Sequence, residues 1–370
     1  MKFPARRRSF ARFNCDRTET TQGVQRSDSA NVRDKLAVND VPPSEMLRIL
    51  AYHRVTKTNG KDTLDCPNIS ASPESFARQM EYVARHYRGV GMPEVLDAVR
   101  SNVPLPERSV LITFDDAYAD FAEIAWPILK QFRLPATLFV PTAYPDHPEL
   151  TFWWDRLYQA FATSTRIVLP ESPLGPLSLE NTAQRRRSLL AMIRHVPRMP
   201  HDAAIGLVDA VCAQLVDRPS RHASVLSWNQ LRQLANDGVT LGSHTRTHPI
   251  MTQISSIQIR EEIKESQQDL LREIGFAVPI FCYPNGNYND SVINVLREEG
   301  ISAAFTVVPG ENRLESTDLL QLGRTCIWPR TSLPIFRLRL QRVGLCLDAW
   351  RQKWQRPVIT PQWNTQEVQP

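Results

Sequence analysis

The chain has 370 residues, 22% of them charged, and a net charge of +5. This length allows one large α/β domain with additions, or two domains. The six cysteines form no Cys-x-x-Cys pair and no cluster, which argues against a structural zinc knot and a disulfide scaffold.

Residues 1–46 are rich in Arg, Ser, Asn and Asp and lack apolar periodicity, so we expect a disordered basic arm there. No apolar run follows the arginines at 6–12, so no secretory signal is visible and a cytoplasmic protein is expected. Export by another route would leave the same pattern. No stretch is long and apolar enough to span a bilayer, so we expect no transmembrane segment. The basic residues are otherwise spread along the chain, and no nucleic-acid partner is expected.

From residue 47 the sequence alternates between strand-like and helical patterns. Ser72 is a candidate N-cap, with Pro73 at the first helical position. The apolar run Ser109–Phe114 predicts a buried strand, because strands covered on both faces lack polar alternation. The predicted elements of this half are strands at 46–53, 109–114 and 136–140 and helices at 73–89, 93–99 and 118–132.

Between about 143 and 226 this alternation lapses into helical patches joined by proline-rich links, and we expect a helical insertion. Its aromatic cluster at 152–154 is of a type that stacks on sugars, but Trp154, Leu157 and Phe161 fall at helical spacing, which favours a packed face.

Alternation resumes at the capping-box pattern that begins at Ser227. A domain is expected over 47–333, and an amphipathic helix with a polar tail over 334–370. The predicted elements are helices at 227–238, 256–274, 291–299 and 334–355 and strands at 239–241, 278–283 and 302–308.

Almost every strand is followed by a helix, which indicates right-handed crossovers and a parallel sheet or barrel. Three strand ends carry polar side chains: Asp115 with Asp116, His244 with His248, and the turn 284–286. Because the carboxyl ends of parallel strands share one edge, where active sites collect, these groups are expected to lie together.

Two histidines four residues apart can share one metal, and neutral imidazole suits zinc and its neighbours. A carboxylate from Asp115 or Asp116 completes a two-His, one-carboxylate site with room for water, as catalytic zinc requires. The other carboxylate then serves as a base, provided that the chain bends after the strand. The alternatives are helix capping by the aspartates and a polar turn at the histidines.

The motifs at 113–116 (TFDD), 243–248 (SHTRTH) and 283–286 (YPNG), in this order, resemble those of the polysaccharide deacetylases that share the NodB homology domain, also called carbohydrate esterase family 4. The resemblance spans about residues 47–330, interrupted by the insertion.

The resemblance implies a distorted (β/α) barrel, usually of seven strands, and metal-dependent removal of acetyl groups. It assigns the general base to Asp115 and the metal to Asp116, His244 and His248. The backbone N–H of Asn285 would stabilise the oxyanion. Zinc is the expected metal, with cobalt or nickel as alternatives.

The sequence departs from the family pattern in four respects, and one is Asn285, which stands where an aromatic residue follows the proline. Cys282 replaces the arginine that opens the third motif, and Arg324 is a candidate for its replacement. Ala117 stands where glycine is common. No histidine follows His248, so the general acid must come from elsewhere, and His53, at the end of the first strand, is our candidate. A structural role for His53 is the alternative.

The leading hypothesis is a hydrolase that removes N-acetyl groups from an N-acetylated sugar in an oligo- or polysaccharide or a glycan precursor. An O-acetyl esterase acting on xylan-type polymers or a hydrolase of a small cyclic amide would use the same site. A catalytically silent carbohydrate-binding scaffold is the third reading, because the third motif is altered and the late histidine is missing.

Overall fold

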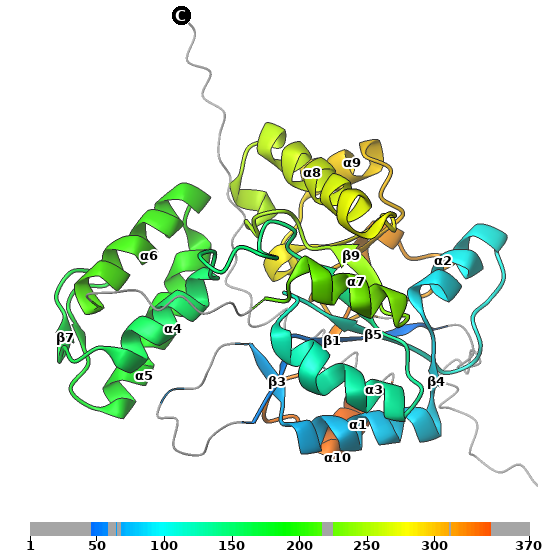
Figure 1. Cartoon of the computed structure of the whole chain (residues 1–370), viewed down its shortest axis with the longest axis horizontal. Coiled ribbons are helices and arrows are strands. Elements are labelled where there is room, and N and C mark those ends of the chain that lie inside the picture. Colours follow the sequence, from blue (N-terminus) through cyan, green and yellow to red (C-terminus); the bar gives the residue numbers. More distant parts are fainter. Residues whose placement is uncertain (1–45, 58–63, 65–67, 217–224, 311, 342–370) are drawn as a thin grey trace, which may run out of the picture. The chain divides into compact units, whose positions relative to one another are not determined.

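The computed structural model describes residues 46–57, 64, 68–216, 225–310 and 312–341. At its centre is a parallel sheet with the strand order β11, β10, β9, β6, β5, β1, β12 (Figure 1). β4 pairs with the first residues of β5, while β6 pairs with the last ones. The strands are β1 Arg48–Tyr52, β4 Arg88–Gly89, β5 Ser109–Phe114, β6 Thr137–Val140, β9 Thr240–Ser243, β10 Ile280–Cys282, β11 Ala303–Phe305 and β12 Thr325–Cys326.

Residues 322–327 connect the two ends of this strand order. Leu322 forms a parallel bridge with Phe305 in β11, and the β12 strand that follows pairs with β1. The backbone N–H of Ile327 then donates to the carbonyl of Ala51 at 3.0 Å. The sheet therefore curls into a distorted (β/α) barrel, and the predicted fold of about seven parallel strands is confirmed.

Burial explains why the strands form where the sequence is apolar. Every residue of β1 and β5 is buried, and the two strands pair in register from Arg48 opposite Val110 to Tyr52 opposite Phe114. Continuous burial of this kind is typical of strands with helices on both faces. The observed β5 has the same bounds, Ser109–Phe114, as the strand predicted from the sequence.

Helices follow the strands and bury their apolar faces. The Ser72 hydroxyl accepts a hydrogen bond from the Ser75 N–H at 3.2 Å, as expected of an N-cap, and Ser227 and Gln230 form the predicted capping box. The helices around the sheet are α1 Pro73–His86, α2 Met92–Ser101, α3 Trp126–Gln131, α7 Trp228–Asn236, α8 Ser256–Ile274, α9 Asp290–Glu298 and α10 Leu333–Arg339.

The helix predicted over 118–132 is irregular. Residues Phe121–Ala125 form a π-helical turn in which the N–H of Trp126 donates to the carbonyl of Phe121, and α3 begins only there. Pro127 has no N–H for the usual bond to the carbonyl four residues earlier, which favours the wider turn at this point.

The expected insertion contains α4 Trp153–Thr163, α5 Thr182–His195, α6 His201–Leu215 and the hairpin of β7 Val168–Leu169 and β8 Leu177–Ser178. Helices α4 and α5 overlap the helical patches that the sequence predicts at 151–161 and 185–195, but the sequence does not predict α6. A separate apolar core holds these elements together, with Phe161, Met192 and Val208 fully buried.

A short parallel pair, β2 Arg54–Val55 and β3 Ile69–Ala71, lies beyond β1. At the other end of the chain, the prediction of one helix through 355 is wrong at residues 340 and 341. Helix α10 ends at Arg339. The carbonyl of Leu340 accepts a hydrogen bond from Arg48 Nε at 2.7 Å, a partner from β1 in place of a backbone N–H of a further helical turn.

The rest of that predicted helix, the polar tail and the basic arm at 1–45 lie outside the described residues. Within the described ranges, no helix combines the length and the apolar character needed to cross a membrane.

Candidate active site

A sharp backbone turn follows β5. The N–H of Asp115 continues the ladder by donating to the Tyr52 carbonyl at 3.0 Å. Asp116 and Ala117 then adopt φ angles of 69° and 51°, in the left-handed region that costs a non-glycine residue roughly 1 kcal/mol. This is the bend that adjacent aspartates need in order to serve one site, and Ala117 adopts it without the glycine common in the family.

Asp116, His244 and His248 form a compact set of potential metal ligands. Asp116 Oδ1 lies 3.4 Å from His244 Nε2 and 3.3 Å from His248 Nε2. Donor atoms 2.0–2.1 Å from a tetrahedral zinc lie roughly 3.3 Å apart, so the spacing fits such an ion. Asn68 Nδ2 donates to the other Asp116 oxygen at 3.2 Å, which leaves Oδ1 facing the histidines.

Hydrogen bonds orient both imidazoles. The His244 Nδ1 lies 2.8 Å from the carbonyl of Cys282, and as the donor in this bond it leaves the Nε2 lone pair available to a metal. The N–H of His248 donates to Thr245 Oγ1 at 2.9 Å, and both residues have φ near 65°. A tight, non-helical turn therefore carries the pair. Burial lowers the pKa of His248, which favours its neutral form.

Asp115 is held by a buried arginine from β12's edge of the barrel. Arg324 is fully buried, and its Nη1 and Nη2 each donate to one Asp115 oxygen at 2.7 Å. Its Nε donates to the Thr306 carbonyl at 3.0 Å and its Nη1 also to Thr113 Oγ1 at 3.1 Å. Burial would raise the pKa of Asp115, but the Arg324 charge and hydrogen bonds hold it below its usual value. Asp115 is thus a carboxylate.

Cys282 lies where the family motif carries arginine. Its Sγ is 3.1 Å from Arg324 Nη2 and 3.6 Å from Asp115 Oδ2, so the guanidinium of Arg324 occupies the space beside the small thiol. The residue before Arg324 is a glycine for a steric reason. A Cβ on Gly323 would come within 2.6 Å of the Val308 carbonyl oxygen.

The two remaining candidates differ in their placement. His53 Nε2 lies 3.8 Å from Asp115 Oδ2, and its side chain is 20% exposed, so it borders the site and meets solvent. Asn285 is exposed, with its Nδ2 bonded to Asn287 Oδ1 at 2.8 Å. Over the described ranges, no contact joins Asn285 to either aspartate, and its role stays a prediction.

The insertion reaches the site through α4, which the sequence did not indicate. The rings of Phe152 and Trp154 meet the His248 ring edge to face, with centroids 5.4 and 5.0 Å apart. Trp154 Nε1 donates to the Tyr118 hydroxyl at 2.8 Å, and that hydroxyl donates to Asp155 Oδ2 at 2.9 Å. Burial raises the pKa of Asp155 to about 6.

Sequence reasoning missed several neighbours of the site for a common reason. Asn68, Tyr118 and Asp155 belong to no motif, and the aromatic cluster at 152–154 was assigned to packing on its helical spacing. The insertion and His248 are far apart in the sequence, and local sequence patterns do not reveal contacts of this kind.

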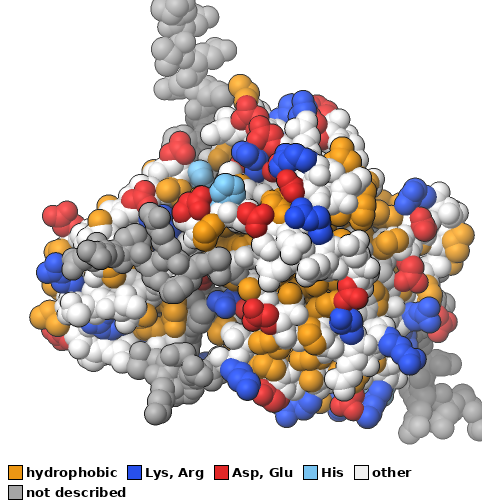
Figure 2. All heavy atoms as spheres, in the orientation of Figure 1, with side chains coloured by type: hydrophobic (Ala, Val, Ile, Leu, Met, Phe, Trp, Pro, Cys, Tyr) orange, Lys and Arg blue, Asp and Glu red, His pale blue; other side chains and the backbone are white. Residues whose placement is uncertain are grey.

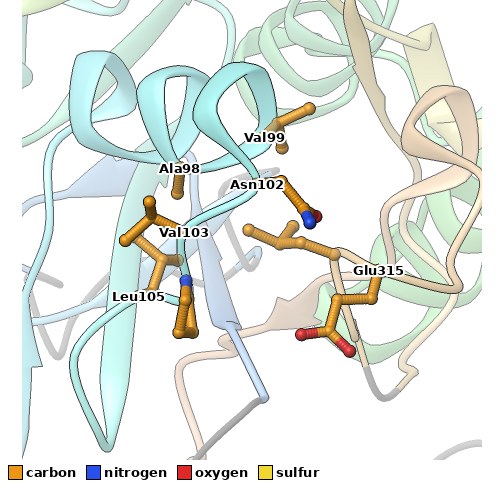
Figure 3. Close-up of a pocket in the computed structure, with 8 residues that line it drawn as sticks. Ala98, Val99, Asn102, Val103, Leu105 and Glu315 are labelled. Carbon is orange, nitrogen blue, oxygen red and sulfur yellow. The ribbon is translucent and has the colours of Figure 1, made fainter.

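Other surface features lie elsewhere. On the face shown in Figure 2, basic and acidic side chains are interspersed with apolar ones, without a broad basic patch. A small crevice lies at the opposite end of the strands, beside the residues that lead into β5 (Figure 3). It is lined by Ala98, Val99, Asn102, Val103, Pro104, Leu105, Leu314 and Glu315.

Comparison with known proteins gives three kinds of match. A family model described as polysaccharide deacetylase matches residues 102–169 and 195–304, which include both aspartates and both histidines. A poly-β-1,6-N-acetyl-D-glucosamine N-deacetylase of Escherichia coli K12 is 29% identical over 116 residues, 31% of this chain and 17% of the relative. The enzyme of that name from Staphylococcus aureus is 33% identical over 26% of this chain and 36% of its own length.

The chain thus matches about a third or less of the length of these relatives. Among solved structures, the Streptococcus pyogenes deacetylase PplD in complex with acetate superposes with a TM-score of 0.55 at 21% identity, covering 80% of this chain and 98% of that one. This likeness agrees with the barrel fold described above. Residues 102–169 and 195–304, which carry both aspartates and both histidines, thus match the polysaccharide deacetylase family.

Proposed function

We propose that this protein is a metal-dependent hydrolase that removes N-acetyl groups from an N-acetylated sugar of a polysaccharide or a glycan precursor. The observation that carries the proposal is the pairing of two differently held carboxylates. Asp116 faces His244 and His248 at metal-ligand spacing, while both Asp115 oxygens accept hydrogen bonds from Arg324. Separate environments of this kind suit one ligand and one base.

A divalent ion held by Asp116, His244 and His248 would act as a Lewis acid toward the acetyl carbonyl and the attacking water. Zinc suits this ligand set, and cobalt or nickel would fit the same donors. In the proposed reaction Asp115 accepts the water proton, and Arg324 keeps its carboxylate aligned and ionised before each turnover.

The leaving amine needs a proton, and His53 is the group we assign to this step. It faces Asp115 across 3.8 Å and has access to solvent, from which it can be reprotonated. The backbone N–H of Asn285 is assigned to the developing oxyanion. Collapse of the tetrahedral intermediate then breaks the C–N bond and releases acetate and the free amine.

The substrate class is supported by the named relatives, which act on poly-β-1,6-N-acetyl-D-glucosamine. We therefore propose an N-acetylated glucosamine oligomer or polymer as the partner of this site. This chain matches only part of those proteins. The β-1,6 linkage is therefore proposed for the substrate of this chain and does not follow from the match itself.

The Asp115→Asn variant tests the assignment of the base. The amide cannot accept the water proton, so turnover of a β-1,6-linked N-acetylglucosamine pentasaccharide should fall by about 10³-fold, while zinc content stays at the wild-type level because Asp115 is no ligand. Acetate release and elemental analysis measure the two quantities. The control is Asp97→Asn, a change at a surface carboxylate that is 70% exposed.

Three outcomes contradict the proposal in different ways. A fully active Asp115→Asn protein removes the base assignment. Loss of zinc from that variant would show that Asp115 is a ligand. A wild-type protein that releases acetate from acetylated xylan but not from the pentasaccharide would be an O-acetyl esterase.

A further inference from the structure

Trp328 is an exposed aromatic side chain at the edge of the barrel where the candidate site lies. It is 54% exposed, and no ring or cation partner is found for it in the described part of the chain. Single exposed apolar side chains are common at protein surfaces, so a role for Trp328 depends on where it lies.

The strand register brings Trp328 to the same end of the barrel as His53. Ala51 of β1 pairs with Cys326 of β12, and two residues further along these parallel strands come His53 and Trp328. The last bond of this ladder runs from the Ile327 N–H to the Ala51 carbonyl, so the segments that carry His53 and Trp328 leave two adjacent strands at the carboxyl edge of the sheet. Trp328 therefore borders the site on the side of the proposed general acid.

The turn that carries Trp328 is rigidly held. The N–H of Thr331 donates to the Trp328 carbonyl at 2.8 Å, and the N–H of Trp328 donates to Thr331 Oγ1 at 3.1 Å. The Thr331 carbonyl accepts from Gln79 Nε2 at 3.4 Å, and Gln79 Oε1 accepts from the Tyr52 hydroxyl at 2.8 Å. Hydrogen bonds thus tie the turn to the end of β1, one residue before His53.

We propose that Trp328 is the platform of a sugar subsite, on which the residue adjoining the reacting N-acetylated sugar stacks. The face of a pyranose ring carries C–H groups that pack on an aromatic ring, while its hydroxyls stay hydrated at the rim. Indole offers a large contact area with little side-chain entropy to lose, and the anchored turn lowers the cost of ordering the platform. This inference rests on the proposed function and names the substrate as an oligomer rather than a single sugar.

The experiment compares Trp328→Ala and Trp328→Phe with wild type on two substrates, a β-1,6-linked N-acetylglucosamine pentasaccharide and a sugar-free aryl acetate. We expect Trp328→Ala to raise the pentasaccharide KM about tenfold with kcat within about twofold. The ratio of pentasaccharide kcat/KM to aryl acetate kcat/KM should fall by the same factor. Trp328→Phe should recover most of the loss, because a flat ring remains.

The matched control is Phe276→Ala. Phe276 is also 54% exposed, but it follows α8 and precedes β10, at the opposite end of the strands, so the pentasaccharide KM should not change. Equal KM values for wild type and Trp328→Ala overturn the subsite, as does an equal loss on both substrates. A wild-type protein that hydrolyses neither substrate overturns the proposed deacetylase function. In that case calorimetry tests the platform, by comparing the Kd of the pentasaccharide for Asp115→Asn with its Kd for the double variant that also carries Trp328→Ala.

Discussion

At the scale of single residues, Arg324 supplies the guanidinium that the family motif places at the position of Cys282. A buried carboxylate without a partner costs several kcal/mol, and Asp115 is 2% exposed. The family motif supplies a guanidinium from the position that Cys282 occupies in β10. Here the guanidinium comes from Arg324 beside β12 and reaches both Asp115 oxygens and the Cys282 sulfur. The same electrostatic requirement is met from the other side of the carboxylate.

Removing this guanidinium should change the pH profile of the reaction. In Arg324→Gln the burial of Asp115, the largest influence on its pKa, loses its strongest opposing influence, the Arg324 charge, so the pKa rises. Because the base must be ionised, the acid limb of kcat/KM should move to higher pH by about one unit or more. The native charge pair stabilises the fold above the unfolded-state pKa of Asp115 and loses that effect as the pH falls through the folded value.

A double variant keeps this test independent of misfolding. Cys282→Arg combined with Arg324→Cys returns the guanidinium to the motif position, within reach of Asp115, and should be more active than Arg324→Cys alone. Rate profiles between pH 5 and 9 measure both effects. An Arg324→Gln protein with the wild-type acid limb, or a double variant no better than the single one, would remove the orienting role of Arg324.

Strand ends predicted four of the site residues, whereas Arg324 was only a candidate, named because the motif arginine is missing, and the structure confirms its contact with Asp115. Asp115, Asp116, His244 and His248 follow well-marked strands, and parallel strands bring such ends to one edge. Arg324 directly precedes β12, which has only two residues and is too short to be recognised as a strand in the sequence. Its contact with Asp115, 209 residues away, depends on the barrel closing through residues 322–327, which periodicity does not reveal.

At the scale of elements, α4 couples the insertion to the barrel. Its residues Leu157 and Phe161 belong to the insertion's own core, while Trp154 and Asp155 contact His248 and Tyr118. Helical spacing correctly predicted a packed face for α4. It did not predict that one end of that face packs against a candidate metal ligand, because periodicity describes which side of a helix is buried and not what covers it.

Trp154 is therefore expected to act as a positioning residue for His248. Trp154→Ala removes the ring that limits the motion of the imidazole, and zinc affinity should fall by about 10- to 100-fold, as for other groups that orient metal ligands. Trp153→Ala is the control, since its ring packs on Trp154 and not on His248. Zinc titration with a competing chelator measures the affinity, and equal affinities of the two variants would contradict this role.

At the scale of the whole molecule, the site draws on segments that are distant in the chain. Its side chains come from the turn after β5, from the turn after β9, from α4 and from the segment that closes the barrel between β11 and β1. A ligand that binds the assembled site but not the unfolded chain stabilises every one of these junctions at once, by an amount set by its concentration relative to its Kd.

Metal binding should accordingly be visible in the thermal stability of the full chain. At a free zinc concentration of about 1,000 times Kd the gain is about 4 kcal/mol, which corresponds to a rise in Tm of about 5–10 °C for a protein of this size. Chelation should reverse the rise. His248→Asn removes one ligand from the set and should abolish most of the zinc-dependent shift, whereas Phe276→Ala should keep it. A wild-type Tm that responds to none of zinc, cobalt and nickel would show that Asp116, His244 and His248 do not form a metal site.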